Sequence, residues 1–278
     1  MLFDSLKGRD FEPSALKLRF KAETLQKLFN DLKQNRNSEE ICLTLDILSK
    51  HGNAKIFEKL EGLMDHPLPE AVLAALNVAG EKNPGNSLEI FKKAARRSEP
   101  FLQCRGLYWL ARRYPDAGME VFTGILETSQ EDLRYPAAAA LTLTRQNLRG
   151  WKILQSGLQN PLEQETKKAL QACLDMEIDL PTEILEALLS HSCLEIRKKA
   201  VTACSFHRAP DIFELLMDAL KQPALSKIAF EALMTLSEKN LSLVGEKMIH
   251  PEFSFTQKNA LFKILEKKGS PEHTHFLT

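Results

Sequence analysis

The sequence predicts an all-α protein built from repeated helical hairpins. Three observations support this prediction: a small residue recurs about every 31 positions, most prolines fall between the predicted helices, and no segment alternates apolar and polar residues as a strand does. A period of this length is typical of stacked supersecondary units, each of which contacts only its neighbours. We therefore expect one continuous α-solenoid of about eight helical hairpins.

The repeat is clearest in the second helix of each hairpin. A large side chain at the small position would force apart helix axes that lie roughly 8–10 Å from one another, and overpacking of this kind costs about 1–3 kcal/mol. The residue after it is apolar in every repeat, as is the residue four positions after it. The small position is occupied by Thr44, Ala75, Gly106, Ala137, Ala169, Ala200, Ala229 and Ala260.

The helices can be placed from this register. Between the second helices lie shorter segments with apolar residues at helical spacing, such as 56–64 and 119–126, which we expect to be the first helices of the hairpins. The first of these begins at about Glu23. The second helices are predicted at 38–50, 69–81, 100–113, 131–145, 163–175, 194–206, 224–238 and 254–267.

Composition excludes several classes of protein. Lys+Arg and Asp+Glu both number 37, so the chain has no net charge, which argues against an overall nucleic-acid-binding surface, since such a surface is basic. No apolar run approaches the roughly 18 residues of a membrane span, so we expect no membrane insertion. The five cysteines show no CxxC spacing, and Cys173 and Cys204 occupy one apolar column. These thiols favour a reduced, cytoplasmic location.

The segments Leu194–Ala203 and Glu131–Leu141 resemble the second helix of HEAT repeats, most closely the short kind found in phycobilisome-lyase-like proteins. The resemblance implies a right-handed α-solenoid, a HEAT-like superhelix, over residues 23–267. It leaves residues 1–22 as an N-terminal extension and 268–278 as a C-terminal tail. In such repeats an arginine ties neighbours together through an acidic residue; Arg134 with Asp132, and Arg197 with Glu195, match that pattern.

No catalytic or cofactor motif is present. The sequence has no His-Glu pair, no GxGxxG or GxxxxGK[ST] loop and no GxSxG elbow. His66, His191, His207 and His250 lie near predicted turns, where we interpret them as caps of the preceding helix. We therefore expect no enzyme activity, no metal and no cofactor.

Basic residues give the one candidate for a binding surface. Between Lys92 and Arg113 there are seven of them and a single acid, Glu99. Others begin the later second helices, so equivalent positions would line up along the concave side of a solenoid. Charge runs are more often solvated faces. The residues that we expect to bind a partner are Arg105, Tyr108, Arg112, Tyr135, Lys168, Lys198 and Lys199.

The function that follows is a non-enzymatic protein-interaction scaffold or regulatory module. Its concave groove would hold a partner helix or peptide, of acidic character if the basic stripe is the site. One alternative is a nucleic-acid-binding protein of the HEAT-like DNA glycosylase type, and the zero net charge counts against it. Others are a lyase or chaperone acting on a chromophore, and a regulatory segment of a larger transporter or enzyme.

Overall fold

The computed structural model describes residues 22–32, 35, 37–128, 131–144, 148–206, 211–237 and 253–268. These residues form fifteen α-helices and one 3-10 helix, with no strand among them, so the all-α prediction is confirmed. The chain divides into two compact units, Met1–Gly118 and Met119–Thr278, which are described separately. The predicted extension and tail lie outside the described residues except at Ala22 and Lys268.

The observed helices follow the predicted register closely. Every predicted second helix is present, with starts that agree to within one residue. The predicted ends near 145 and 238 lie outside the described residues, as does the first helix of the eighth pair. The second helices are α2 (Ser38–His51), α4 (Pro69–Lys82), α6 (Pro100–Arg113), α8 (Glu131–Leu143), α10 (Glu163–Asp175), α12 (Leu194–Cys204), α14 (Pro223–Ser237) and α16 (Phe255–Lys268). The first helices are α1 (Ala22–Leu32), α3 (Ala54–Phe57) with the 3-10 helix η2 (Glu58–Leu63), α5 (Ser87–Ala94), α7 (Pro115–Glu127), α9 (Leu148–Leu158), α11 (Thr182–Leu189) and α13 (Asp211–Leu220).

The first helix of the second pair differs from the prediction. The apolar residues at 56–64 suggest a continuous α-helix, but only Ala54–Phe57 is α-helical before the chain tightens into η2. Leu60 and Leu63, both buried, are three residues apart, which is the period that brings side chains to one side of a 3-10 helix. The tighter helix therefore buries the same residues.

The turns before four of the second helices contain the same type of hydrogen bond. The side chains of Asn35, His66, Asn160 and His191 each accept a bond from the backbone N–H two residues further on, at 2.8–3.2 Å. These four positions are equivalent in the repeat, nine residues before the small position. His66 and His191 thus do not cap the preceding helix as expected, and His207 and His250 lie outside the described residues. The Nδ1 atoms of His66 and His191 cap the turn that leads into the next helix, a role that asparagine fills in the other two repeats.

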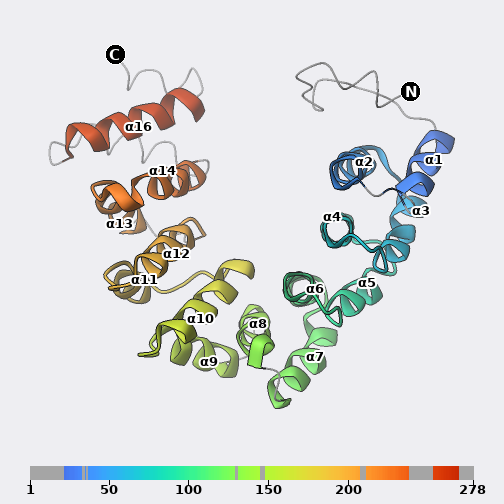
Figure 1. The fold of residues 1–278 in the computed structure, drawn as a ribbon, viewed down its shortest axis with the longest axis horizontal. Coiled ribbons are helices and arrows are strands. Elements are labelled where there is room, and N and C mark those ends of the chain that lie inside the picture. The colour runs from blue at the N-terminus through green and yellow to red at the C-terminus, as the bar shows by residue number, and fades with distance from the viewer. Residues whose placement is uncertain are drawn as a thin grey trace. The chain divides into compact units, whose positions relative to one another are not determined.

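In residues 22–118, α4 packs between α2 and α6, and α1, η2 and α5 lie beside them (Figure 1). The small positions Thr44, Ala75 and Gly106 are buried between these helices. A Cβ atom added to Gly106 would lie only 2.6 Å from the backbone nitrogen of Ala95. The backbone at the end of α5 is thus in direct contact with α6. A side chain at position 106 would have no room, which explains why glycine occupies the repeat position here.

In residues 119–278, α8, α10, α12, α14 and α16 pack in succession, and α9, α11 and α13 lie beside them (Figure 1). The small positions Ala137, Ala169, Ala200 and Ala229 are buried, whereas Ala260 in the last helix is partly exposed. Here the closest approaches use glycines of the first helix, because Gly150 and Gly157 in α9 face α8 and α10. No helix of the described residues is both long and apolar enough to cross a membrane.

Candidate functional site

Three of the predicted site residues meet on the surface of α6. The side chain of Tyr108 lies between two guanidinium groups, with the Arg105 carbon Cζ 5.0 Å and the Arg112 Cζ 4.8 Å from the ring centroid. The spacing i−3 and i+4 along one helix places all three on the same face. Tyr108 is only 5 % exposed, while Arg112 is exposed and Arg105 half-buried. We call these three residues the arginine clamp.

The ring of Tyr108 is held by its own neighbours. It meets Trp109 edge to face, with ring centroids 5.0 Å apart and an interplanar angle of 77°. Trp109 in turn lies over Gly80 of α4, where any Cβ would collide with the indole ring. The guanidinium of Arg113 donates from Nε to the Gly80 carbonyl at 2.9 Å and lies over the Trp109 ring. The aromatic support of the clamp is therefore tied to the neighbouring repeat.

Stacked guanidinium groups suit the recognition of anions. An aromatic ring occupies one face of the cation and leaves the N–H groups at its edge pointing sideways, where they can donate to a carboxylate or phosphate. The chemistry of two guanidinium groups on one ring is therefore that of a cationic, hydrogen-bond-donating surface.

The remaining basic residues between 92 and 113 are mostly occupied. The pKa of the Glu99 carboxyl lies below its ordinary value because Arg97 hydrogen-bonds to it. Arg96 is exposed, and its backbone N–H donates to the Lys93 carbonyl at 3.2 Å. The printed pairs are Lys92–Glu89 at 3.3 Å, Lys93–Asp65 at 2.7 Å and Arg97–Glu99 at 2.6 Å.

The other four predicted site residues lie in residues 119–278. Tyr135 of α8 is 5 % exposed and donates its hydroxyl to Oε2 of Glu165 in α10 at 2.8 Å. Burial and this bond to a carboxylate raise the pKa of Tyr135 to about 12. Lys168 lies 3.7 Å from Oε1 of the same Glu165. Tyr135 therefore joins two repeats internally and presents little surface to a partner.

Glu195 neutralises the next set of lysines. Its carboxylate lies 2.8 Å from Nζ of Lys167 and 3.8 Å from Nζ of Lys199. The hydrogen bond from Lys167 lowers the pKa of Glu195, and the same bond raises the pKa of Lys167. Lys198 is half-buried on α12. In this unit the basic residues alternate with carboxylates and do not form a purely basic stripe.

The arginines matched to the HEAT pattern behave differently from that pattern. Arg197 donates from Nη1 to the carbonyls of His191 and Ser192, at 2.8 and 3.1 Å, and not to Glu195 as expected. It thus closes the turn between α11 and α12. Arg134 lies over the ring of Tyr135, 5.8 Å from its centroid.

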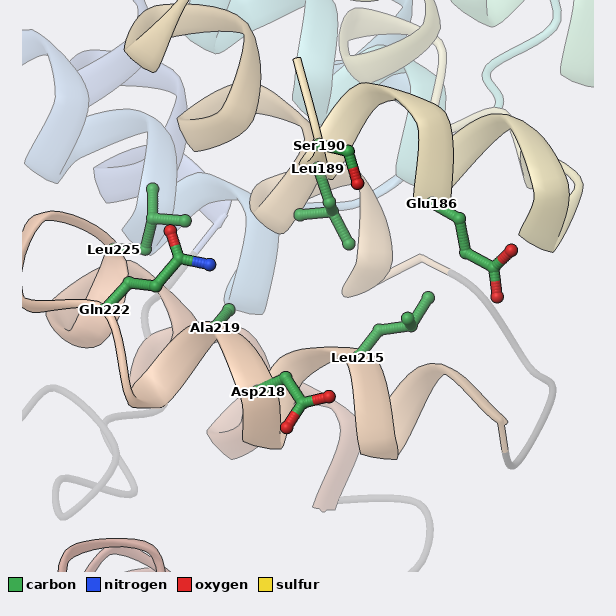
Figure 2. A pocket seen from close by; sticks show the side chains of 8 residues that line it. All are labelled: Glu186, Leu189, Ser190, Leu215, Asp218, Ala219, Gln222 and Leu225. Carbon is green, nitrogen blue, oxygen red and sulfur yellow. The ribbon is translucent and has the colours of Figure 1, made fainter. Parts of the chain in front are cut away.

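A second candidate site lies between the first helices α11 and α13, at residues that were not predicted from the sequence. A groove of about 400 Å³ is lined by residues of both helices and of the start of α14. Figure 2 shows Leu189 and Leu215 pointing toward one another across it. Because its residues come from neighbouring repeats, only the packing of α11 on α13 creates it. The lining residues are Glu186, Leu189, Ser190, Leu215, Asp218, Ala219, Gln222 and Leu225.

Metal-ion groupings and cysteine thiols were the remaining candidates for chemistry in the described part of the chain. No three His, Cys, Asp or Glu side chains of those residues are grouped to hold a metal ion. All five cysteines are free thiols, and burial raises the pKa of Cys173 and of Cys204 to about 12. Thiols held protonated in this way are poor nucleophiles.

The sequence matches no family model and no curated protein. The resemblance to HEAT repeats therefore remains a prediction from the residues that suggested it.

Proposed function

We propose that the protein is a HEAT-like, right-handed α-solenoid that acts as a non-enzymatic interaction module. Its arginine clamp binds an acidic side chain of a partner helix or peptide. The observation on which this proposal rests is the stack of Arg105 and Arg112 on the ring of Tyr108.

The clamp suits this role because it is assembled before any partner arrives. Tyr108 is buried against Trp109, so the ring is fixed, and each guanidinium loses less side-chain freedom on binding than an unsupported arginine would. A guanidinium also pairs with a carboxylate through two parallel bonds, which a lysine cannot do. The basic residues of α10 and α12 contribute less, because Glu165 and Glu195 already pair with them.

Binding of a fluorescein-labelled Glu-rich peptide, followed by fluorescence anisotropy, tests the proposal. We expect the double variant Arg105→Gln/Arg112→Gln to bind it at least about tenfold more weakly, since charged hydrogen bonds contribute roughly 1.5–3 kcal/mol each. The matched control is Lys55→Gln/Lys82→Gln, which removes two exposed cations of the same unit outside the clamp. Circular dichroism checks that all variants fold alike.

Equal losses in the two double variants would contradict the proposal, because a general charge effect would then explain the binding. A single-stranded oligonucleotide in place of the peptide tests the nucleic-acid alternative. Tighter binding of the oligonucleotide than of the peptide, with a steep decrease as salt rises, would favour that alternative.

A further inference from the structure

The groove between α11 and α13 has an apolar floor. Ala219 and Leu225 are 3 % and 1 % exposed at its base, and the half-buried Leu189 and Leu215 face each other from the two helices (Figure 2). A volume of about 400 Å³ lies within the usual range of binding pockets and exceeds that of one side chain. The groove can therefore accept an aliphatic side chain together with part of a longer one.

The rim of this floor is negative. Glu186 and Asp218 are exposed acids in the last turns of α11 and α13, and neither helix has a basic residue in its last turn. The carbonyl end of a helix itself carries a partial negative charge of about half a unit. By contrast, α4, α5 and α6 each end with lysine or arginine. The ends of α11 and α13 and the two carboxylates that line the groove therefore carry charge of the same sign.

Among the described residues, Lys221 is a cation close to this rim. Lys221 pairs with Asp218 at 2.7 Å, with side chains that are 57 % and 69 % exposed. An exposed pair of this kind is worth roughly 0–1 kcal/mol, so a cation from a partner can replace it. Glu186 forms no ion pair with the described residues.

An apolar floor with a negative rim selects an amphipathic cation. The methylene stem of an arginine or lysine covers aliphatic surface while its head remains at the edge in reach of carboxylates. Ser190 and Gln222 line the same groove and offer a hydroxyl and an amide to the backbone of a bound chain. A phosphate or an acidic segment would be repelled by this rim.

We propose that the groove between α11 and α13 binds a peptide segment in which an arginine or lysine lies beside a leucine-sized residue. The aliphatic residue enters between Leu189 and Leu215, and the basic head lies between Glu186 and Asp218. This surface prefers the opposite charge to the arginine clamp. It lies on first helices, whereas the clamp is on a second helix, so the two sites do not depend on each other.

The probe for the test is a short fluorescein-labelled peptide rich in Leu and Arg, with a peptide of the same length in which Glu replaces Arg. Anisotropy should show binding of the Leu/Arg peptide only. We expect about tenfold weaker binding to Glu186→Gln/Asp218→Asn, since each neutralised carboxylate removes a charged bond. The control Glu183→Gln/Glu231→Gln removes two exposed acids of α11 and α14 outside the groove and should bind as the wild type does.

A second variant tests the apolar part. Ser190→Trp places a bulky ring on an exposed position of the groove without changing a core residue, and it should reduce binding about tenfold or more by occupying the floor. The proposal is overturned if the Leu/Arg peptide does not bind, if the Leu/Glu peptide binds equally well, or if Ser190→Trp binds like the wild type. Concentration-dependent dimers in sedimentation that disappear in Glu186→Gln/Asp218→Asn would assign the groove to a second copy and also overturn it. The groove variants leave the clamp intact, so the Glu-rich peptide should bind them unchanged whichever result is obtained.

Discussion

The basic residues of α6 and those of α10 and α12 occupy similar positions in the repeat but have different surroundings. On α6, the guanidinium groups of Arg105 and Arg112 lie over the aromatic ring of Tyr108. On α10 and α12, the lysines face Glu165 and Glu195, which neutralise them. Basic residues at similar repeat positions therefore differ in how far neighbouring side chains neutralise their charge.

The two units also differ in how they bring helices together. In residues 22–118, Gly80 and Gly106 make close contacts with neighbouring helices from second helices, whereas in residues 148–206 Gly150 and Gly157 do so from a first helix. Buried titrating groups differ too, because Tyr135, Cys173 and Cys204 all belong to the second unit. Changes at these positions should affect one unit and spare the other.

The largest difference is expected at high pH. The pKa of about 12 for Cys173, Cys204 and Tyr135 exceeds the values of roughly 8.5 and 10 in an unfolded chain. Because the folded protein keeps these groups protonated, they contribute their full stabilisation of the folded state at pH values below the unfolded pKa. This contribution is lost as the pH rises from about 8.5 through 12, by several kcal/mol in total. In urea unfolding between about pH 8 and 11, the free energy of unfolding of residues 119–278 should decrease before that of the first unit.

Each unit contains one tryptophan, Trp109 or Trp151, so the variants Trp151→Phe and Trp109→Phe report the two transitions by fluorescence. In the Trp109→Phe background, Cys173→Ala/Cys204→Ala should lower stability at neutral pH but flatten its alkaline decline. Cys42→Ala removes an exposed thiol and is the control. An unchanged alkaline slope in the double variant would contradict the assignment to these thiols.

The next largest difference concerns two helical glycines. Gly106→Ala should destabilise the first unit by about 1–3 kcal/mol, because the new Cβ meets backbone of α5 that has no room to move. Gly124→Ala, on α7 in the second unit, meets nothing within 4 Å and should stabilise by about 0.5–1 kcal/mol through helix propensity. Thermal unfolding of both variants measures this, and a stabilising Gly106→Ala would disprove the close approach.

A smaller effect is expected at the shared turn of the repeats. His66→Ala loses the acceptor for the Leu68 N–H and should cost about 1 kcal/mol, whereas His66→Asn should retain most of the stability because asparagine makes the same bond at Asn35 and Asn160. Urea midpoints of the three proteins provide the comparison. Equal midpoints for alanine and asparagine would show that this bond does not stabilise the turn.

The smallest effect concerns the ion pairs of Glu195. Its lowered pKa, caused first by the bond from Lys167, means that the pairing contributes above the unfolded pKa of roughly 4.3 and is lost as pH falls through the folded value. Glu195 is exposed and its two lysine partners are partly exposed. We therefore expect Glu195→Gln to change the melting temperature only slightly, and high salt to remove the difference between variant and wild type. Melting temperatures at low and high salt check this, with Glu131→Gln as the exposed control. A large, salt-independent loss would show that Glu195 has a packing role as well.

The sequence by itself determined the helices and their order. A small residue about every 31 positions, followed by an apolar one, requires that each helix bury one stripe against the next, and this local requirement placed α4, α6 and α12 almost to the residue. Periodicity is a property of neighbouring residues, so it can be read without knowing the fold. The grouping of Arg105, Tyr108 and Arg112 could be predicted from the sequence for the same reason, since all three lie on one helix.

Only the tertiary structure decided which surfaces are available. The bond between Tyr135 and Glu165 joins residues 30 positions apart, and the groove between α11 and α13 exists because two repeats pack at a particular distance. The lysines of α10 and α12 show the same dependence, because Lys167 pairs with Glu195, 28 positions later in the sequence. Such contacts depend on the offset between repeats, which no single helix encodes. Charge and burial at a surface are set by neighbours that only packing brings together.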